Sequence, residues 1–488
     1  MSHSPLKPSL LLSLTPVALL VAILVLNVRV FGDGATSGPN QLALFVAALA
    51  TAAIGHTQLQ RHYDLLEREA IQAITLAMKA NLILLTVGAL IGLWIAAGVV
   101  PTLIYYGVKM ISPGVFLPVA CAACAIVSLA IGSSWSTMGT IGVALIGVGE
   151  TLGIPLPMVA GAIVSGAYFG DKLSPLSDTT NLAPAAAGTE LFTHIRHMLY
   201  TTVPTMLLTL AAFSALGLAY QGDQYDPALV EGVLTTLDAY FNITPLALAT
   251  PMAVFVLVML RMPAVPALIL GIFFAALQAF VLQGSLVDRL LGDTQGFAAI
   301  YTLLVETGVN GFSIETGSEL VDQLLNKGGM LGMLNTVLLI VMALFFGGMM
   351  EATGMLNRLA EAVLSLVRGP ASLVAATIGT CTLFNLTASD QYLSIVIPGR
   401  MFRNAYQALG LDARNLSRSL EDGGTVTSVL VPWNTCGAFA ATVLGVSTLS
   451  FAPFAFFCLL SPVVSIVVAA ADWRITRLPP EPASCTAG

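Results

Sequence analysis

The sequence predicts an all-α polytopic membrane protein with two inverted-topology repeats, each containing a re-entrant hairpin and a broken transmembrane helix. Three observations predict this fold class. First, 57% of the 488 residues are hydrophobic and only 9% are charged, whereas a soluble domain carries about a quarter charged residues. Second, apolar stretches of about the 20 residues that cross a bilayer recur along the chain. Third, polar clusters interrupt several such stretches, and they do so similarly in both halves.

Eight stretches are uninterrupted and apolar enough to cross a membrane. The first is too long for a typical signal-peptide core and lacks a clean cleavage site after it, so we expect it to be retained as a helix. Glycine and proline are frequent, which membrane helices tolerate where neighbours satisfy the backbone. The predicted spans are residues 10–28, 36–55, 81–100, 198–220, 239–260, 262–284, 329–350 and 448–471.

The distribution of arginine and lysine sets the orientation. Basic residues follow the second span as Arg61, Arg68 and Lys79 and recur in several later loops, whereas residues 221–238 hold acids and no basic residue. Because cytoplasmic loops carry an excess of lysine and arginine, we expect both termini to be cytoplasmic and residues 221–238 to be external.

Matching residues at a fixed offset predict an internal repeat. Gly98 and Gly354 lie 256 residues apart, and on this topology the span 81–100 runs outward whereas 329–350 runs inward. Like segments of opposite direction are typical of inverted-topology transporters. Further matches are Gly92 with Gly348, Ala96 with Ala352, Ser133 with Ser389, Ser134 with Asp390 and, at 257, Pro175 with Pro432. The predicted repeats are residues 1–238, with hairpin 113–148 and broken helix 158–193, and residues 239–488, with hairpin 370–399 and broken helix 416–447.

Each predicted hairpin has two apolar arms and a polar tip, at residues 132–137 and 385–391. The arms are too short for two comfortable spans, and basic residues flank both ends of the second hairpin. Polar backbone at membrane depth is tolerated only where it is buried in protein or lines a polar cavity. We therefore expect re-entrant hairpins, with ordinary loops as the alternative.

The first broken segment, residues 170–181, concentrates oxygen ligands. Asp171 and Asp178 lie on either side of Pro175, which removes a backbone donor and helps to break the helix. Hard cations prefer carboxylate, hydroxyl and carbonyl oxygens, and an ionisable residue inside a membrane is a functional candidate by default. We expect Lys172 to neutralise Asp171 in part. A cytoplasmic loop with ordinary helix caps is the alternative.

The second half offers further acidic candidates. Glu421 and Asp422 precede two glycines that indicate an unwound stretch, and adjacent acids point to different sides of a helix. We take Asp422 as the candidate, and the choice against Glu421 stays open. Asp390, in the second hairpin tip, is either an ion ligand or the N-cap of the following arm.

These residues predict a secondary transporter and no cofactor. A desolvated carboxylate holds a proton or a cation, so competition between the two ions couples their fluxes. An enzyme is disfavoured because no nucleophile–base pair or metal-ligand set is evident. A channel is disfavoured because it would need a continuous polar pore, whereas the polar residues gather in separate clusters. The chain lacks a Walker A motif and a basic stripe for nucleic acid. Cys121 and Cys124 lie in an apolar arm and are expected to be inert.

At these positions the sequence resembles the NhaC family of bacterial sodium/proton antiporters. The resemblance runs from about residue 70 onward and is carried by residues 132–137, 161–181 (GAIVSGAYFGDKLSPLSDTTN), 385–391 and 421–435. It implies sodium/proton antiport by alternating access in a bacterial cytoplasmic membrane, with the bilayer, sodium and protons as partners. A homodimer is compatible with this interpretation. Some family members look like exchangers of organic acids or amino acids, so ion-coupled exchange of a malate- or lactate-type acid or an amino acid is the alternative.

The resemblance also implies site residues. It places Asp171, Ser174, Asp178 and Thr179 at the ion site, and Ser133, Ser134, Asn385, Ser389 and Asp390 at the hairpin tips. Where the family often has glycine after Ser-Trp, this chain has Ser136. The full predicted ion- and proton-binding set is Asp171, Ser174, Asp178, Thr179, Asp390 and Asp422, with sodium held by Asp171, Asp178 and Asp390. The predicted substrate set is Ser133, Ser134, Asn385, Ser389 and Asn434.

Overall fold

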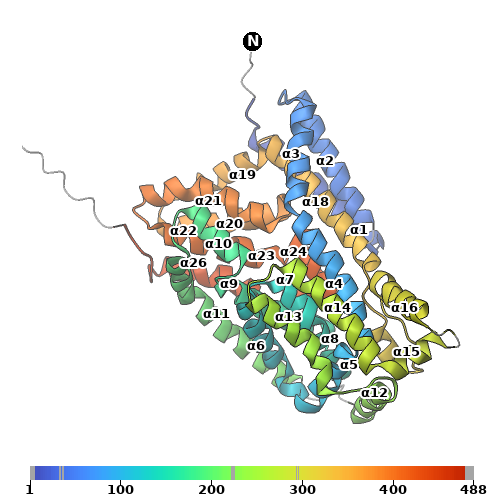
Figure 1. The fold of residues 1–488 in the computed structure, drawn as a ribbon. Coiled ribbons are helices and arrows are strands. Elements are labelled where there is room, and N and C mark those ends of the chain that lie inside the picture. The colour runs from blue at the N-terminus through green and yellow to red at the C-terminus, as the bar shows by residue number, and fades with distance from the viewer. Residues whose placement is uncertain are drawn as a thin grey trace, which may run out of the picture.

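The chain is a multi-pass, all-helical membrane protein (Figure 1). The computed structural model describes residues 6–31, 34–35, 38–220, 226–292, 294 and 296–478. Within these ranges, eight helices are long and apolar enough to cross a membrane, or ten if each of two bent pairs is one span. The predicted spans that match such helices are α1 (Leu10–Phe31), α2 (Pro39–Thr57), α4 (Met78–Ala96), α11 (Leu191–Ala219), α14 (Ala264–Leu282) and α18 (Leu334–Ala352).

Two predicted spans are wrong as continuous helices. Residues 239–260 contain a bend of 85°, because α12 (Pro227–Tyr240) ends before the short η3 (Pro245–Leu248) and α13 (Ala249–Met259) begin. Residues 448–471 are divided into α25 (Thr448–Phe451), η6 (Ala452–Phe454) and α26 (Phe456–Ala470). Proline explains both interruptions, since Pro245 and Pro453 lack the N–H that a continuing helix requires.

The first half contains the predicted hairpin and the predicted broken helix. The hairpin comprises α6 (Pro113–Ile131), α7 (Ser134–Thr137), the π-helical η2 (Met138–Gly142) and α8 (Val143–Thr151). The broken helix comprises α9 (Leu156–Leu173) and α10 (Asp178–Ala187). The arm α6 has the length expected of it, and its 19 residues are enough to cross a membrane.

Glycine allows α6 and α9 to pack with their backbones almost in contact. A Cβ added at Gly166 would lie 2.0 Å from the carbonyl oxygen of Cys121, and one at Gly170 would lie 2.3 Å from that of Ala125. Ser128 also donates a hydrogen bond of 2.6 Å to the carbonyl of Ala167. The hairpin and the broken helix are therefore joined along several turns.

The second half follows the same order. After α18 come α19 (Met355–Leu364), the hairpin helices α20 (Pro370–Thr387) and α21 (Gln391–Ala408), and α22 (Ala413–Leu420). The broken segment continues through the π-helical η5 (Glu421–Thr425) and α23 (Val426–Ser428) to α24 (Thr435–Leu444). The arm α20, like α6, is long enough to span a membrane alone.

The remaining helices surround these elements. In Figure 1, α3 (Tyr63–Leu76) and α19 lie at the upper end of the view, whereas α12, α15 (Gly284–Leu291) and α16 (Phe297–Asn310) gather at the lower end. The amphipathic α5 (Val99–Met110), α17 (Glu319–Leu325) and η4 (Leu331–Met333) complete the chain. Of the predicted external segment 221–238, residues 221–225 lie outside the described residues, and the rest is mostly α12.

Backbone conformation recurs between the two halves. Gly98 (φ 75°, ψ 7°) and Gly354 (φ 77°, ψ 9°) both adopt the left-handed conformation immediately before an amphipathic helix. At both helix breaks an extended polar residue caps the next helix, Ser177 in the first half and Asn434 in the second. These caps are 257 residues apart.

The hairpin tips differ by one residue from the predicted register. Ser133 is the N-cap of α7 and Asp390 is the N-cap of α21, both with extended backbones. The residues before them, Gly132 (φ 75°) and Ser389 (φ 59°), are both left-handed. These conformations match Asp390 with Ser133, one residue away from the predicted pairings of Ser133 with Ser389 and of Ser134 with Asp390.

Candidate functional site

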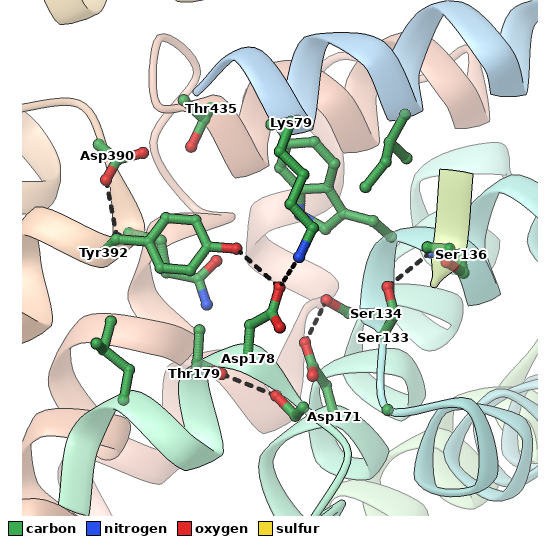
Figure 2. A pocket seen from close by; sticks show the side chains of 18 of the residues that line it. Lys79, Ser133, Ser134, Ser136, Asp171, Asp178, Thr179, Asp390, Tyr392 and Thr435 are labelled. Carbon is green, nitrogen blue, oxygen red and sulfur yellow. Dashed lines mark hydrogen bonds and ion pairs between the residues drawn. The ribbon is translucent and has the colours of Figure 1, made fainter. Parts of the chain in front are cut away.

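A cavity of about 1110 Å³ lies where the two hairpin tips meet the first helix break. Figure 2 shows that its side chains come from both halves of the chain. Its lining includes two sets of residues that bear on ion binding. The polar set is Ser133, Ser134, Ser136, Asp171, Ser177, Asp178, Thr179, Asp390, Gln391, Tyr392 and Thr435, and the charged set from the surrounding helices is Glu69, Lys79, Arg261, Glu351 and Arg400.

Asp171 lies buried at the end of α9, facing the first hairpin tip. Its Oδ2 accepts a hydrogen bond of 2.6 Å from the Ser134 hydroxyl (Figure 2). The break that follows is held by Thr180, whose hydroxyl lies 3.0 Å from the carbonyl oxygen of Asp171 and 3.1 Å from that of Lys172. The carboxylate of Asp171 is thus presented to the cavity by a fixed backbone.

Serine and asparagine side chains shape the break itself. The Ser177 hydroxyl accepts from the N–H of Thr180 at 3.4 Å and lies 3.1 Å from the Thr179 hydroxyl. Asn181 donates to the carbonyl oxygens of Pro175 and Ser177 at 2.9 and 2.7 Å. These groups place the hydroxyls of Ser177 and Thr179 along the cavity wall.

Asp178 occupies a different environment from Asp171. Its side chain is 56% exposed, and it forms an ion pair of 2.6 Å with Lys79, which is 61% exposed. The Tyr392 hydroxyl lies 3.5 Å from the same carboxylate oxygen (Figure 2). Asp178 therefore lies in the solvent-accessible part of the cavity, and the two predicted sodium ligands of this segment are not equivalent.

Asp390 caps the second arm of its hairpin. Its Oδ1 accepts hydrogen bonds from the N–H groups of Tyr392 and Leu393 at 2.9 and 3.0 Å. The side chain is almost fully buried, yet it lines the cavity. Ser389 is fixed beside it, because its carbonyl oxygen accepts from the N–H of Thr435 at 3.0 Å. The capping alternative therefore accounts for Oδ1. The second carboxylate oxygen, Oδ2, takes no part in the cap and is available to the cavity.

Besides Ser389, three predicted site residues of the breaks and the second tip lie outside the cavity lining. Asn385 donates to the carbonyl of Gly424 at 2.7 Å and to the hydroxyl of Thr427 at 2.9 Å. Asn434 caps α24 and donates to both oxygens of Asn385 at 3.2 Å. The Ser174 hydroxyl accepts only from the nearby N–H of Leu176 among the described contacts. These three side chains hold the breaks and the second tip in place.

Asp422 forms a fully buried ion pair with Lys172. The expectation that Lys172 neutralises Asp171 is wrong, because the ammonium group points to the second half instead. Ser461 donates to Asp422 at 2.7 Å, and Thr201 lies 3.3 Å from its other oxygen. Asp422 does not line the cavity among the described residues. The adjacent Glu421 is also fully buried, and neither of its carboxylate oxygens has a partner in the described part of the chain.

Sequence reasoning missed several lining residues. Ser177 and Thr435 belong to passages that were singled out, and their positions at the start of the helix after each break, Ser177 as its N-cap and Thr435 as its first residue, could have indicated them. Tyr392 directly follows the second tip. Lys79 reaches the site from the start of α4, about 100 residues away along the chain, and no local pattern identifies it.

Comparisons with known proteins agree with the membrane fold. Residues 166–473 match the model of the Na+/H+ antiporter family. The Na(+)/H(+) antiporter NhaC of Alkalihalophilus pseudofirmus is 39% identical over 422 residues, which cover 86% of this chain and 88% of that protein.

Two other relatives carry different names. The malate-2H(+)/Na(+)-lactate antiporter of Bacillus subtilis is 40% identical over 88% of this chain and 88% of its own length. The arginine/ornithine antiporter ArcD of Halobacterium salinarum is 35% identical over 97% of this chain and 94% of its own. Because the family model matches more than half of the chain and these relatives match most of it, the protein is a member of the Na+/H+ antiporter family.

Proposed function

We propose that this protein exchanges sodium for protons by alternating access. The single observation that carries this proposal is the buried carboxylate of Asp171, which lies at a helix break, faces a cavity and accepts a hydrogen bond from Ser134. A carboxylate in this position holds either a proton or a cation, because an empty buried charge is costly. The name of the NhaC relative supports the same exchange.

Competition for Asp171 provides the coupling. When a proton leaves, the carboxylate and the lone pairs of nearby hydroxyls are free to coordinate sodium. The Ser134 hydroxyl can rotate to donate to the carboxylate or to offer a lone pair to the ion. Ser177 and Thr179 contribute hydroxyl oxygens to the same wall. Asp390 contributes Oδ2, while its Oδ1 remains committed to the cap.

We assign Asp178 and Asp422 to other tasks. Asp178, paired with Lys79, attracts cations in the accessible part of the cavity. Asp422, paired with Lys172, fixes the second broken helix against the first and thereby positions Asp171. Lys172 directly follows Asp171, so a change in this ion pair would alter the orientation of the ion-binding carboxylate.

The architecture that we propose is a pair of inverted-topology repeats with re-entrant hairpins. The support is the recurring order of amphipathic helix, hairpin and broken helix, together with the matching conformations of Gly98 and Gly354. Residues 1–238 and 239–488 are the proposed repeats. In such transporters the substrate site lies near the midplane, at the interface of the repeats.

The proposed location is a bacterial cytoplasmic membrane, with both termini in the cytoplasm. The cavity is then open to the cytoplasm, since Lys79, Arg261 and Arg400 line it and basic residues mark that side. The acidic α12 lies at the other end of the molecule (Figure 1). This conformation corresponds to an inward-facing state.

Exchange of a small organic acid or an amino acid is the second candidate. The volume of about 1110 Å³ is far larger than an ion requires, and Arg261 and Arg400 line it. The names of two relatives include malate, lactate, arginine and ornithine. In this case the hairpin-tip serines would contact the substrate.

Proteoliposomes with an internal pH dye test the two functions directly. Sodium added to one side should drive proton flux without any organic substrate, and the Asp171→Asn protein should give none. Flux that requires malate, lactate, arginine or ornithine would overturn sodium/proton exchange in favour of the second candidate. Empty liposomes and the Arg358→Gln variant serve as controls, since Arg358 lies outside the cavity lining.

A further inference from the structure

A second cavity, of about 490 Å³, lies apart from the proposed ion site. It is formed by the first turns of α11, the start of α22 and the segment that follows α26. Its polar lining consists of Thr193, Arg196, His197, Tyr200, Arg414, Arg474 and Thr476. No carboxylate belongs to this lining among the described residues.

The three arginines leave positive charge that their neighbours do not balance. Arg414 is paired with Asp412, with Nε 3.0 Å and Nη2 3.3 Å from its two oxygens. In the described part of the chain, Arg196 and Arg474 have no carboxylate within ion-pair distance, and Arg474 instead lies over the Tyr200 ring at 4.8 Å. Two free guanidinium groups beside one cavity favour an anion that accepts several hydrogen bonds, and phosphate suits this geometry.

The cavity is held in shape by the segment after α26. The carbonyl oxygen of Thr476 accepts from the N–H of Asp412 at 3.0 Å and from the Asn415 side chain at 2.6 Å. The N–H of Thr476 donates to Oδ1 of the Asn415 side chain at 3.1 Å. An isolated β-bridge joins Leu411 and Arg477. Arg474 and Arg414 are thus placed on the same rim by a fixed backbone.

The surroundings of this cavity indicate a lipid as the source of the phosphate. α11 and α26 extend side by side away from this cavity. Both carry exposed apolar side chains, including Leu207, which is 63% exposed, and Val467, which is 60% exposed. Trp473, next to Arg474, is 48% exposed, and exposed tryptophan is typical of the membrane interface. Acyl chains could lie along these helices while the headgroup enters the basic cavity.

We propose that this cavity binds the phosphate of an anionic phospholipid in the cytoplasmic leaflet. Basic pockets between transmembrane helices bind such headgroups through arginine and lysine. Phosphate is the chemistry shared with a soluble anion. The interfacial tryptophan and the apolar faces of α11 and α26 favour the lipid over the free ion.

Side-chain contacts link this cavity to the proposed transport site. His197, which lines it, lies 3.2 Å from Nη1 of the fully buried Arg418. Arg418 is on α22, one helical turn before Asp422. A bound lipid would hold α11, α22 and the final segment together, and it would stabilise the setting of the Lys172–Asp422 ion pair.

Native mass spectrometry of the full-length protein tests the binding. The purified protein is titrated with phosphatidylglycerol, phosphatidylcholine or inorganic phosphate. We expect phosphatidylglycerol adducts in preference to the other two. Removing two interfacial charges costs about 1 kcal/mol each, so the Arg196→Gln/Arg474→Gln variant should bind phosphatidylglycerol about 30-fold more weakly.

A matched variant controls for overall charge. Arg289→Gln/Arg358→Gln also removes two positive charges, from α15 and α19, and should bind phosphatidylglycerol like the parent. Equal binding by the parent and by the Arg196→Gln/Arg474→Gln variant would overturn the site. Binding of inorganic phosphate as tight as that of the lipid would overturn the lipid assignment. Neither readout requires transport, so the result is independent of the proposed antiport.

Discussion

Lys172 and Asp422, 250 residues apart in sequence, form an ion pair that no solvent reaches. Lys172 lies in the last turn of α9, the first part of one broken helix, and Asp422 lies in the π-helical turn of the other. Ser461 bonds to both charged groups, donating to Asp422 and accepting from Lys172 at 3.1 Å. The pair therefore joins the two halves of the protein close to Asp171.

Removal of one partner of this pair should be more damaging than removal of both. Lys172→Met leaves a buried carboxylate without its partner and should destabilise the protein by about 3–5 kcal/mol. Lys172→Met/Asp422→Asn should recover part of this loss. The thermal midpoints of the parent, the two single variants and the double variant in detergent form a double-mutant cycle. Effects that simply add would contradict the coupling.

The two aspartates of the first break should respond differently to the same substitution. Asp171→Asn should abolish sodium-dependent proton flux, because an amide cannot exchange a proton for a cation. Asp178→Asn should retain flux and raise the half-saturating sodium concentration by at most about fivefold, since exposed ion pairs contribute at most about 1 kcal/mol. Sodium-dependent proton flux is measured in proteoliposomes for both variants. Each variant serves as the matched control of the other, because both replace an aspartate of the same break by asparagine. Full flux in Asp171→Asn would exclude it as the exchange site.

Asp390 allows its capping role to be separated from its role as a ligand. Asn is as good an N-cap as Asp, so Asp390→Asn should keep the thermal midpoint, whereas Asp390→Ala should cost about 1 kcal/mol. If Oδ2 coordinates sodium, both variants should need more sodium for half-maximal exchange. A sodium curve of Asp390→Asn that coincides with the parent's would make Asp390 a cap alone.

Gly98 and Gly354 provide a matched pair for the backbone. Alanine in the left-handed conformation costs about 1–2 kcal/mol at either position. At Gly98 the added Cβ would lie 2.1 Å from Nε2 of Gln283, which is held by two hydrogen bonds to Asn242, whereas at Gly354 the nearest atom is 3.8 Å away. Gly98→Ala should therefore lower the thermal midpoint clearly more than Gly354→Ala. Equal midpoints would show that Gln283 can move at little cost.

Cysteine labelling at exposed positions tests the proposed membrane topology. A membrane-impermeant maleimide should label Glu231→Cys, on α12, in intact cells, whereas Ser365→Cys, after α19, should react only after permeabilisation. The five cysteines in the described residues are buried, and Cys485 would be replaced by serine in the parent. The reverse pattern of labelling would invert the orientation.

Patterns that depend on local chemistry were predictable from the sequence. Apolar length indicated six of the spans, and the proline and glycine breaks located the interruptions at Ser174 and Asn434. Gly98 and Gly354, which the sequence paired, share one left-handed backbone conformation. Boundaries were weaker where a proline lies near a span end, as Pro245 and Pro453 show.

Partners across the chain were not predictable. Lys172 is adjacent to Asp171, yet its charge is used by a residue in the other half. The sequence also cannot tell that Asp171 is buried and Asp178 exposed, because both lie in one short polar passage, and the burial depends on where Ser134 and Lys79 are brought by the fold. The one-residue shift at the hairpin tips follows from Ser389 adopting a conformation that serine rarely takes.

The glycine contacts between α6 and α9 have a mechanical consequence. With Gly166 and Gly170 set against the carbonyls of Cys121 and Ala125, these helices cannot slide past one another without separating, since the side chains of α9 next to the glycines would collide with α6. Any movement of the first hairpin must therefore carry α9 and Asp171 with it as one rigid body. The bound ion would travel with Asp171 and Ser134, and the change in geometry would fall where the chain enters this unit before α6 and leaves it after α9.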